Sequence, residues 1–432
     1  MQKISLKKYL LPLIASVQII SAQTYTLDEL IIESLQNSPD VAISEMQYNA
    51  SEKRYNAAFA NYLPSIDMLG SAGLIHQDET LTTPKSIDDT LLLGKLSLKQ
   101  LVYDFGKTGG SVDSNKYQVQ AAQMQNLQKI SDKKRDVKQA YYNVLKAKAL
   151  IDVQKESVKL NAAQLYRARK YFDAGIRTKI DVSDAKVRLI QAKLKLKKAQ
   201  YDLKLAYTEL DKVVGFEDLE KQYDVLTQAL DLAHLYGSLS LYPLGLKDAI
   251  LYAYEHRPEV QSTLAQLQAR RSEIHTASAE YFPALYLNAS YTYQHLDEYT
   301  EYLPQKQWDA TLNLNWNFYK GGATQANKEE KKIQASISES ELLNTKLQIK
   351  KNTTDAYLTL NRSRDTVELD QSLLEVSMEK FTQASKRYEH GLSDYIELQE
   401  ARQGYIDSKA ILIIDYYNYY IAFANLDNAI GK

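Results

Sequence analysis

The residues that most resemble a chemical site are Tyr103 to Gly110, YDFGKTGG, which end like a phosphate-binding loop. Such a loop has the pattern G-x-x-x-x-G-K-[ST], in which the first glycine lets successive backbone N–H groups point at phosphate oxygens. Leu101 stands where that first glycine is needed. Half of a short motif is common by chance, so the stretch does not predict nucleotide binding and its glycines need another explanation.

Two pairs of carboxylates are the other candidates for chemistry. Asp181 and Asp184 lie three residues apart, and Glu397 and Glu400 repeat that spacing in a similar stretch of sequence. Carboxylates one helical turn apart could serve as a general acid and base. Neither pair is accompanied by a nucleophile or a further base, so we expect no enzyme. Acids in the first turn of a helix are also favoured by the helix dipole alone.

Composition limits the remaining classes of function. The chain has 432 residues and a formal charge of −1, which does not favour a nucleic-acid partner. Six scattered histidines and no cysteine do not favour a multi-histidine metal site, although carboxylates could still form one; we expect no metal, and no motif calls for a cofactor. The absence of cysteine also predicts that the exported chain has no disulfides and is not a lipoprotein.

The N-terminus predicts export. Lys3, Lys7 and Lys8 precede a mostly apolar run that ends near the small residues Ser21 and Ala22. This is the pattern of a signal peptide over residues 1–22, cut after Ala22. The run is too short to span a bilayer, and no later stretch approaches the about 20 apolar residues that a membrane helix needs.

The rest of the chain repeats itself. NSPDV and NYLPSI in the first half match HRPEV and EYFPAL in the second, and both prolines move by 219 positions, from Pro39 to Pro258 and from Pro64 to Pro283. Gly106 and Gly175 match Gly322 and Gly391 at an offset of 216. An internal offset of this kind indicates one structural unit built twice. We place the repeats at 23–215 and 243–432, joined by a connecting segment at 216–242.

Each repeat contains a long stretch without proline or glycine, from 111 to 174 and from 323 to 390. Helices over these stretches would be roughly 95 to 100 Å long. Their apolar residues alternate in steps of three and four, which is the period of left-handed coiled-coil packing. A secreted or periplasmic structural or adhesion protein built from coiled coils would explain this pattern by itself.

The strands predicted next to these helices favour another class. Apolar and polar residues alternate over about 284–295 and 307–319, and weaker copies lie at about 65–76 and 91–103. Each is close to the 9 to 11 residues with which a tilted strand crosses an outer membrane. Both tryptophans, Trp308 and Trp316, lie near the ends of the last strand, where indole rings favour the membrane interface.

Four strands cannot close a membrane barrel. Unpaired strand edges are not tolerated in lipid, so the strands must pair with those of other copies. The sequence therefore predicts an α+β membrane protein whose strands pair with those of other copies, and a homotrimer would give a shared 12-stranded outer-membrane β-barrel. The long coiled-coil helices would continue the barrel as a hollow periplasmic cylinder.

At this point the chain resembles the TolC-like outer-membrane efflux proteins. The resemblance rests on the doubled openings already quoted, the junctions LKQLVYDFGK and NLNWNFYKGG, and the turns YFDAGIRTKIDVSDA and YEHGLSDYIELQEA. It implies a trimeric, passive exit duct of a tripartite efflux pump or type I secretion system. The implied partners are a periplasmic adaptor protein, an inner-membrane transporter of the RND, ABC or MFS type, and outer-membrane lipid.

The resemblance also assigns roles to residues at the turns near 175 and 391, which would form the periplasmic tip. The implied gate residues are Glu397, Glu400, Asp181, Asp184 and Tyr388, with a bond from Tyr388 to Asp181 that helps to hold the gate shut. An arginine that shares this bond in some members is replaced by Ser393. The implied adaptor contacts are Gly175, Ile176, Gly391 and Leu392, which could equally be ordinary turn residues.

The opening stretch then has a structural meaning. Lys107 is matched by Ala323 in the second repeat, whereas Gly106 is matched by Gly322, next to Gly321. We expect these glycines at the joints between strand and helix, where the chain turns sharply and needs unusual backbone angles.

Overall fold

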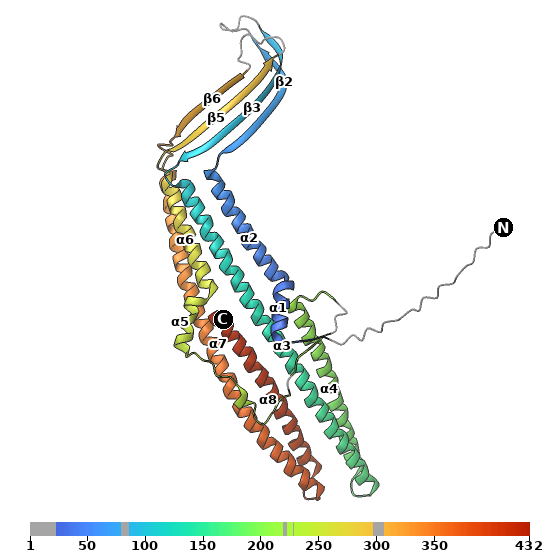
Figure 1. The fold of residues 1–432 in the computed structure, drawn as a ribbon. Coiled ribbons are helices and arrows are strands. Elements are labelled where there is room, and N and C mark those ends of the chain that lie inside the picture. The colour runs from blue at the N-terminus through green and yellow to red at the C-terminus, as the bar shows by residue number, and fades with distance from the viewer. Residues whose placement is uncertain (1–22, 79–85, 219–222, 228, 297–305) are drawn as a thin grey trace, which may run out of the picture.

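The computed structural model describes residues 23–78, 86–218, 223–227, 229–296 and 306–432. The predicted signal peptide, 1–22, lies outside the described residues. Figure 1 shows a long molecule with a curved sheet at one end and bundled helices running away from it.

The sheet is antiparallel and has the strand order β2-β3-β5-β6. Its strands are β2 (Ser65–Gln77), β3 (Ile87–Tyr103), β5 (Ala284–Leu296) and β6 (Lys306–Asn315). Strand β6 is shorter than the alternation predicts, because Trp316 turns away and donates its indole N–H to the backbone oxygen of Tyr281 at 3.1 Å. Strands β2 and β6 form the two outer edges of this sheet.

The helices follow the same order in both halves of the chain. The first half has α1 (Leu27–Asn37), α2 (Pro39–Phe59), α3 (Lys107–Asp173) and α4 (Lys179–Val214), and the second has α5 (Leu246–His256), α6 (Pro258–Ala279), α7 (Ala323–Glu389) and α8 (Tyr395–Ile430). Helices α3 and α7 contain 67 residues each, which is about 100 Å at 1.5 Å per residue. Helices α4 and α8 fold back along them, so each half ends in a hairpin (Figure 1).

The joint between sheet and helix explains the glycines of the opening stretch. Gly106, Gly321 and Gly322 all have positive φ angles, of 90°, 60° and 85°. Helix α3 begins at Lys107, four residues earlier than the sequence predicts, because the Asp104 carboxylate accepts from the backbone N–H of Gly106 and of Thr108, at 3.2 and 2.7 Å. The stretch thus caps a helix with its own carboxylate.

The doubled proline motifs mark sharp corners between helices. Pro39 and Pro258 are the first residues of α2 and α6, where a missing N–H costs nothing. The glycines that end α4 and α8 pack against these corners. A Cβ on Gly215 would lie 2.8 Å from the backbone oxygen of Asn37, and one on Gly431 would lie 3.1 Å from that of His256.

The core lies along the seams between the long helices. Heptad positions such as Val137, Val144, Leu360 and Val367 are fully or almost fully buried there. No described helix is long and apolar enough to cross a membrane.

The described parts of the connecting segment, 216–218, 223–227 and 229–242, lie against the helices. Strand β4 (Tyr223–Val225) pairs in parallel with β1 (Gln23–Tyr25), and a short 3₁₀ helix, η2, covers Tyr236–Ser238; a second, η1, covers Ala60–Tyr62 before the sheet. Tyr141 of α3 donates to the backbone oxygen of Leu226, and Tyr419 of α8 donates to that of Ser240. The segment thus ties the two hairpins together.

Candidate functional site

The two hairpins end in turns of the same geometry. Gly175 and Gly391 have φ angles of 74° and 72°. The N–H groups of Ile176 and Leu392 close each turn by donating to backbone oxygens at the ends of α3 and α7. The side chains of Ile176 and Leu392 are 67% and 70% exposed, so each hairpin presents one apolar residue at its tip.

The first acid pair begins α4. The Asp181 carboxylate accepts from the backbone N–H and the hydroxyl of Thr178, both at 3.0 Å, and Thr178 accepts from the Asp181 N–H in return. This reciprocal arrangement is a capping box, which satisfies N–H groups that the helix leaves free. Asp184 is exposed one turn further on. Asp181 therefore stabilises the start of its own helix, which is enough to explain an acid in the first turn.

The second acid pair begins α8 and differs from the first. The helix is capped by Asp394, which accepts from the Glu397 N–H at 2.8 Å. The Glu397 carboxylate accepts from the Arg387 guanidinium at 2.7 Å. Glu400 is exposed and has no hydrogen bond or ion pair with any described residue. Of this pair, Glu400 is the carboxylate whose charge is not compensated by a neighbour in the described chain.

Tyr388 lies in a small core at the tip. It is 4% exposed and packs with Leu398 and Ala401 of α8, and its ring centre lies 6.5 Å from that of Tyr171 on α3. Burial raises the pKa of the Tyr388 hydroxyl above its ordinary value. The side chain therefore joins the two hairpins from the inside.

The bond expected from Tyr388 to Asp181 does not form within the described chain. Asp181 is instead occupied by its capping box with Thr178. A different contact joins the same turns: the Arg177 guanidinium lies 5.4 Å from the centre of the Tyr388 ring, a cation–π geometry.

Sequence reasoning missed Arg177, although a signal was present. Arg177 stands two residues after Gly175, where the second repeat has Ser393 two residues after Gly391. The arginine is thus found in the first repeat instead of the second. A second link between the hairpins is the ion pair of Arg167 with Glu389, at 2.9 Å.

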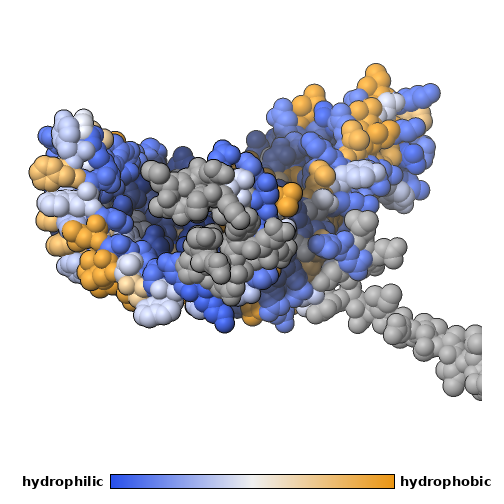
Figure 2. All heavy atoms as spheres, turned by 90° about the horizontal axis from the view of Figure 1, so that it is seen from above, coloured by the Kyte–Doolittle hydropathy of each residue, from blue (hydrophilic) through white to orange (hydrophobic). Residues whose placement is uncertain are grey.

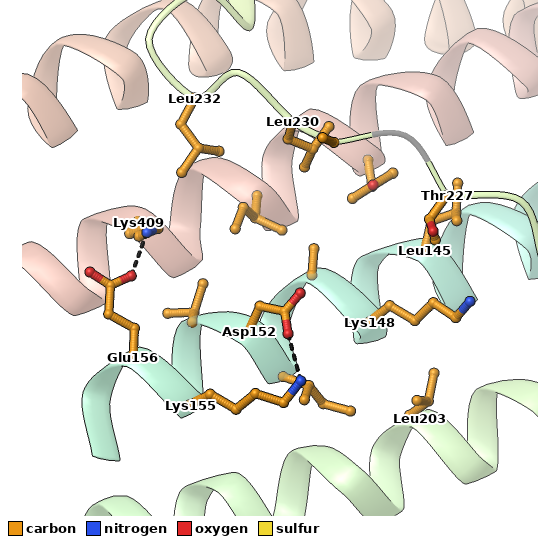
Figure 3. Close-up of a pocket in the computed structure, with 16 residues that line it drawn as sticks. Leu145, Lys148, Asp152, Lys155, Glu156, Leu203, Thr227, Leu230, Leu232 and Lys409 are labelled. Carbon is orange, nitrogen blue, oxygen red and sulfur yellow. Dashed lines mark hydrogen bonds and ion pairs between the residues drawn. The ribbon is translucent and has the colours of Figure 1, made fainter. Parts of the chain in front are cut away.

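A cavity of about 810 Å³ lies higher up, between α3, α4, α8 and the connecting segment. Figure 3 shows its apolar walls, with Leu203, Leu230 and Leu232 around charged side chains. These charges are paired: Lys409 with Glu156 at 2.5 Å, and Lys155 with Asp152 at 2.8 Å. Among the described residues no group of three or more histidines and acids could hold a metal ion.

Comparison with known proteins agrees with this architecture. Residues 30–216 and 250–432 match the family model described as outer membrane efflux protein. Two similar curated proteins, both from Pseudomonas putida, are the toluene efflux pump outer membrane protein TtgC and the antibiotic efflux pump outer membrane protein ArpC. Each is 21% identical over 415 residues, which cover 94% of this chain and 82% of the relative.

Solved structures share the fold at low sequence identity. A membrane protein from Pseudomonas aeruginosa superposes with a TM-score of 0.82 at 18% identity, covering 94% of this chain and 93% of that one. The CmeC outer membrane channel of Campylobacter jejuni gives a TM-score of 0.81 at 16% identity, covering 94% of this chain and 85% of CmeC. The predicted resemblance is thereby confirmed.

Proposed function

We propose that this chain, which belongs to the outer membrane efflux protein family, forms the outer-membrane exit duct of a tripartite efflux pump. Three copies would share a 12-stranded barrel and continue it into the periplasm as a helical tunnel. The duct would be passive and would need no cofactor. The observation that carries the proposal is the four-stranded sheet with two open edges at the end of hairpins about 100 Å long.

The surface of the sheet supports its place in a membrane. Exposed apolar side chains include Met68, Leu74, Leu312 and Leu314, which is costly in water and favourable in lipid. Trp308 and Trp316 are eight positions apart, or about 26 Å along an extended chain, which at a strand tilt of about 40° covers roughly 20 Å of the roughly 25 Å apolar band of outer-membrane barrels. We assign the two tryptophans to the two membrane interfaces.

The shape of the helical part supports a tunnel. Seen from above, from the end that carries the sheet, the molecule is curved, and apolar residues are exposed on both sides of the view (Figure 2). Sides of this kind suit contacts with further copies, and the repeated order of elements would give three copies a pseudo-sixfold ring. The repeat would thus be an internal duplication.

The tips would hold the gate. We assign the gate to Glu397, Glu400, Asp181, Asp184 and Tyr388 and add Arg177, whose contact with Tyr388 joins the hairpins. Ile176 and Leu392, after Gly175 and Gly391, would contact a periplasmic adaptor, which links the duct to an inner-membrane transporter. The names of the relatives favour small organic molecules as cargo.

Fractionation tests the proposal. We expect a heat-modifiable trimer in purified outer membranes that forms channels in planar bilayers. Recovery as a soluble periplasmic or secreted protein would contradict the duct and support a structural coiled-coil protein instead.

A further inference from the structure

The two hairpins have outward-facing helices, α4 on one side of the molecule and α7 on the other (Figure 1). Among the long described helices α4 packs mainly on α3, and α7 packs on α6 and α8. Each still exposes an apolar stripe with helical spacing. The stripe on α4 contains Val187, Ile190, Leu194, Tyr201 and Leu205, and that on α7 contains Leu358, Leu369, Leu373 and Val376.

Opposite charges accompany these stripes. Residues 186–204 of α4 contain seven basic residues and one acid, Asp202, whereas residues 365–379 of α7 contain five acids and no basic residue. The basic residues are Lys186, Arg188, Lys193, Lys195, Lys197, Lys198 and Lys204, and the acids are Asp365, Glu368, Asp370, Glu375 and Glu379. All are exposed except Asp370, which is half-buried. None forms an ion pair with another described residue.

The two charged stretches lie at the same height. The basic stretch is 11 to 29 residues from Gly175, and the acidic stretch is 12 to 26 residues from Gly391. Both therefore begin about 17 Å above the tips, and they overlap over about 20 Å of helix axis. The basic residues of α4 and the acidic residues of α7 therefore lie at the same distance from the tips.

The repeat provides an internal comparison. The part of α8 that matches the basic stretch, 402–420, has two basic and two acidic residues, and the part of α3 that matches the acidic stretch, 149–163, also has two of each. Helices α3 and α8 lie in the middle of the molecule (Figure 1). The charge bias is therefore confined to the two edge helices and is no general property of the repeated unit.

We propose that α4 of one copy pairs with α7 of the next copy through an ionic seam formed by these stretches. The contact joins two different surfaces, and such head-to-tail contacts build rings. The seam rests on the proposed duct. It would determine which helices of neighbouring copies pair, and it would make the stability of the trimer depend on salt concentration. Since the charges are exposed, salt would screen them, and the tip half of the tunnel would loosen first.

Cysteine cross-linking tests the pairing directly, because the chain has no cysteine of its own. Leu194 and Leu373 lie 19 and 18 residues from their tip glycines. The full chain with Leu194→Cys and Leu373→Cys should give an oxidant-dependent ladder of dimers and trimers in outer membranes. The matched control combines Leu194→Cys with Leu343→Cys, which is exposed on α7 but about 45 Å further up, and should give no ladder.

Charge reversal tests the electrostatics. Lys193→Glu with Lys197→Glu and Lys198→Glu, or Glu368→Lys with Glu375→Lys and Glu379→Lys, should each lower the cross-linking yield several-fold. Combining both triple changes in one chain should restore it, since every copy carries both edges. Raising the salt from about 0.05 M to about 1 M should lower the wild-type yield and leave the reversed triple variants little changed.

The outcomes separate the seam from the duct. Conducting trimers that give no ladder, or that assemble normally with either triple reversal, would overturn the seam and leave the duct standing. A monomeric soluble chain would overturn the duct itself.

Discussion

Gly110 shows how one missing methyl group sets the distance between two helices. A Cβ at this position would lie 2.5 Å from Thr276 Oγ1 and 2.8 Å from the Thr276 backbone nitrogen, so α3 and α6 could not approach as they do. We predict that Gly110→Ala lowers the free energy of unfolding by about 1–3 kcal/mol through overpacking.

Gly404 provides the control. It lies inside α8, and a Cβ there would meet no atom within 4 Å. Gly404→Ala should stabilise the protein by about 0.5–1 kcal/mol, because alanine loses less backbone entropy in a helix. Thermal unfolding followed by circular dichroism measures the stability of both variants. Equal changes in stability for Gly110→Ala and Gly404→Ala would contradict the close approach of α3 and α6.

Under the proposed gate, the contact of Arg177 with Tyr388 helps to hold the two hairpin tips together. A cation–π contact is worth about 0.5–1 kcal/mol at an exposed site, so Arg177→Met should shift the balance toward the open form about two- to five-fold per chain. Arg177→Lys should retain part of the effect.

Single-channel recording in planar bilayers checks this prediction. The control is Lys170→Met, which removes a cation–π contact with Tyr166. Both residues lie in α3, so this contact does not connect the two hairpins. If the channel is closed for the same fraction of time with arginine or methionine at position 177, the contact of Arg177 with Tyr388 has no role in the gate.

At the scale of elements, local patterns explain what the sequence predicts well. The strands and long helices follow from alternation and heptads, which are properties of neighbouring residues. Trp316 continues the alternation although β6 has already ended, because its hydrogen bond to Tyr281 lies outside the sheet. The pairing of β1 with β4 joins residues about 200 positions apart, and no local pattern in the connecting segment announces it.

Among the proposed gate residues, too, some features can be predicted from local sequence and others cannot. The glycine turns and the acids after them are visible in the repeat, because they follow local rules for ending and starting helices. The contacts between the two hairpins are set by tertiary packing instead. Thr178 holds Asp181 and Arg387 holds Glu397 locally, and the contact of Tyr388 with the first repeat comes from Arg177 in place of Asp181.

The pairing of α7 with α8 contains a carboxyl group that should make stability depend on pH. Burial and a hydrogen bond with Asp415 raise the pKa of Asp370 to about 6 from an ordinary value of 3.8. The folded protein therefore holds this proton more tightly than the unfolded chain does, so the contribution of Asp370 to stability is fully present below about pH 4 and is lost as the pH rises through about 6.

Asp370→Asn should remove this fall, because the amide stays neutral and can still donate to Asp415. The gain at neutral pH should be about 1 kcal/mol or less, since solvent reaches the site. The midpoint of thermal unfolding between about pH 4 and about pH 7 measures it, with Asp202→Asn on the exposed face of α4 as control. A variant with the wild-type pH profile would exclude Asp370 as the group responsible.

At the scale of the whole molecule, the same repeated unit serves two media. The sheet exposes apolar side chains that would face lipid in the proposed barrel, whereas the long helices bury most of theirs along the seams between them and carry exposed charges. The glycines of the two joints let the chain turn from a strand of the sheet into a long helix within a few residues. The stretch that resembles a phosphate loop is one of these joints.

A ring of carboxylates would form only in the proposed trimer, so ion selectivity tests the whole architecture. Three copies of Glu400, which has no partner among the described residues, would attract cations near the axis, whereas the charge of Glu397 is offset by Arg387 at 2.7 Å. Glu400→Gln should therefore lower the preference for cations more than Glu397→Gln does, and Arg387→Gln should raise it by freeing Glu397. Reversal potentials in a salt gradient across planar bilayers distinguish the three variants. Selectivity that is unchanged in all three would mean that these carboxylates do not line the path of the ions.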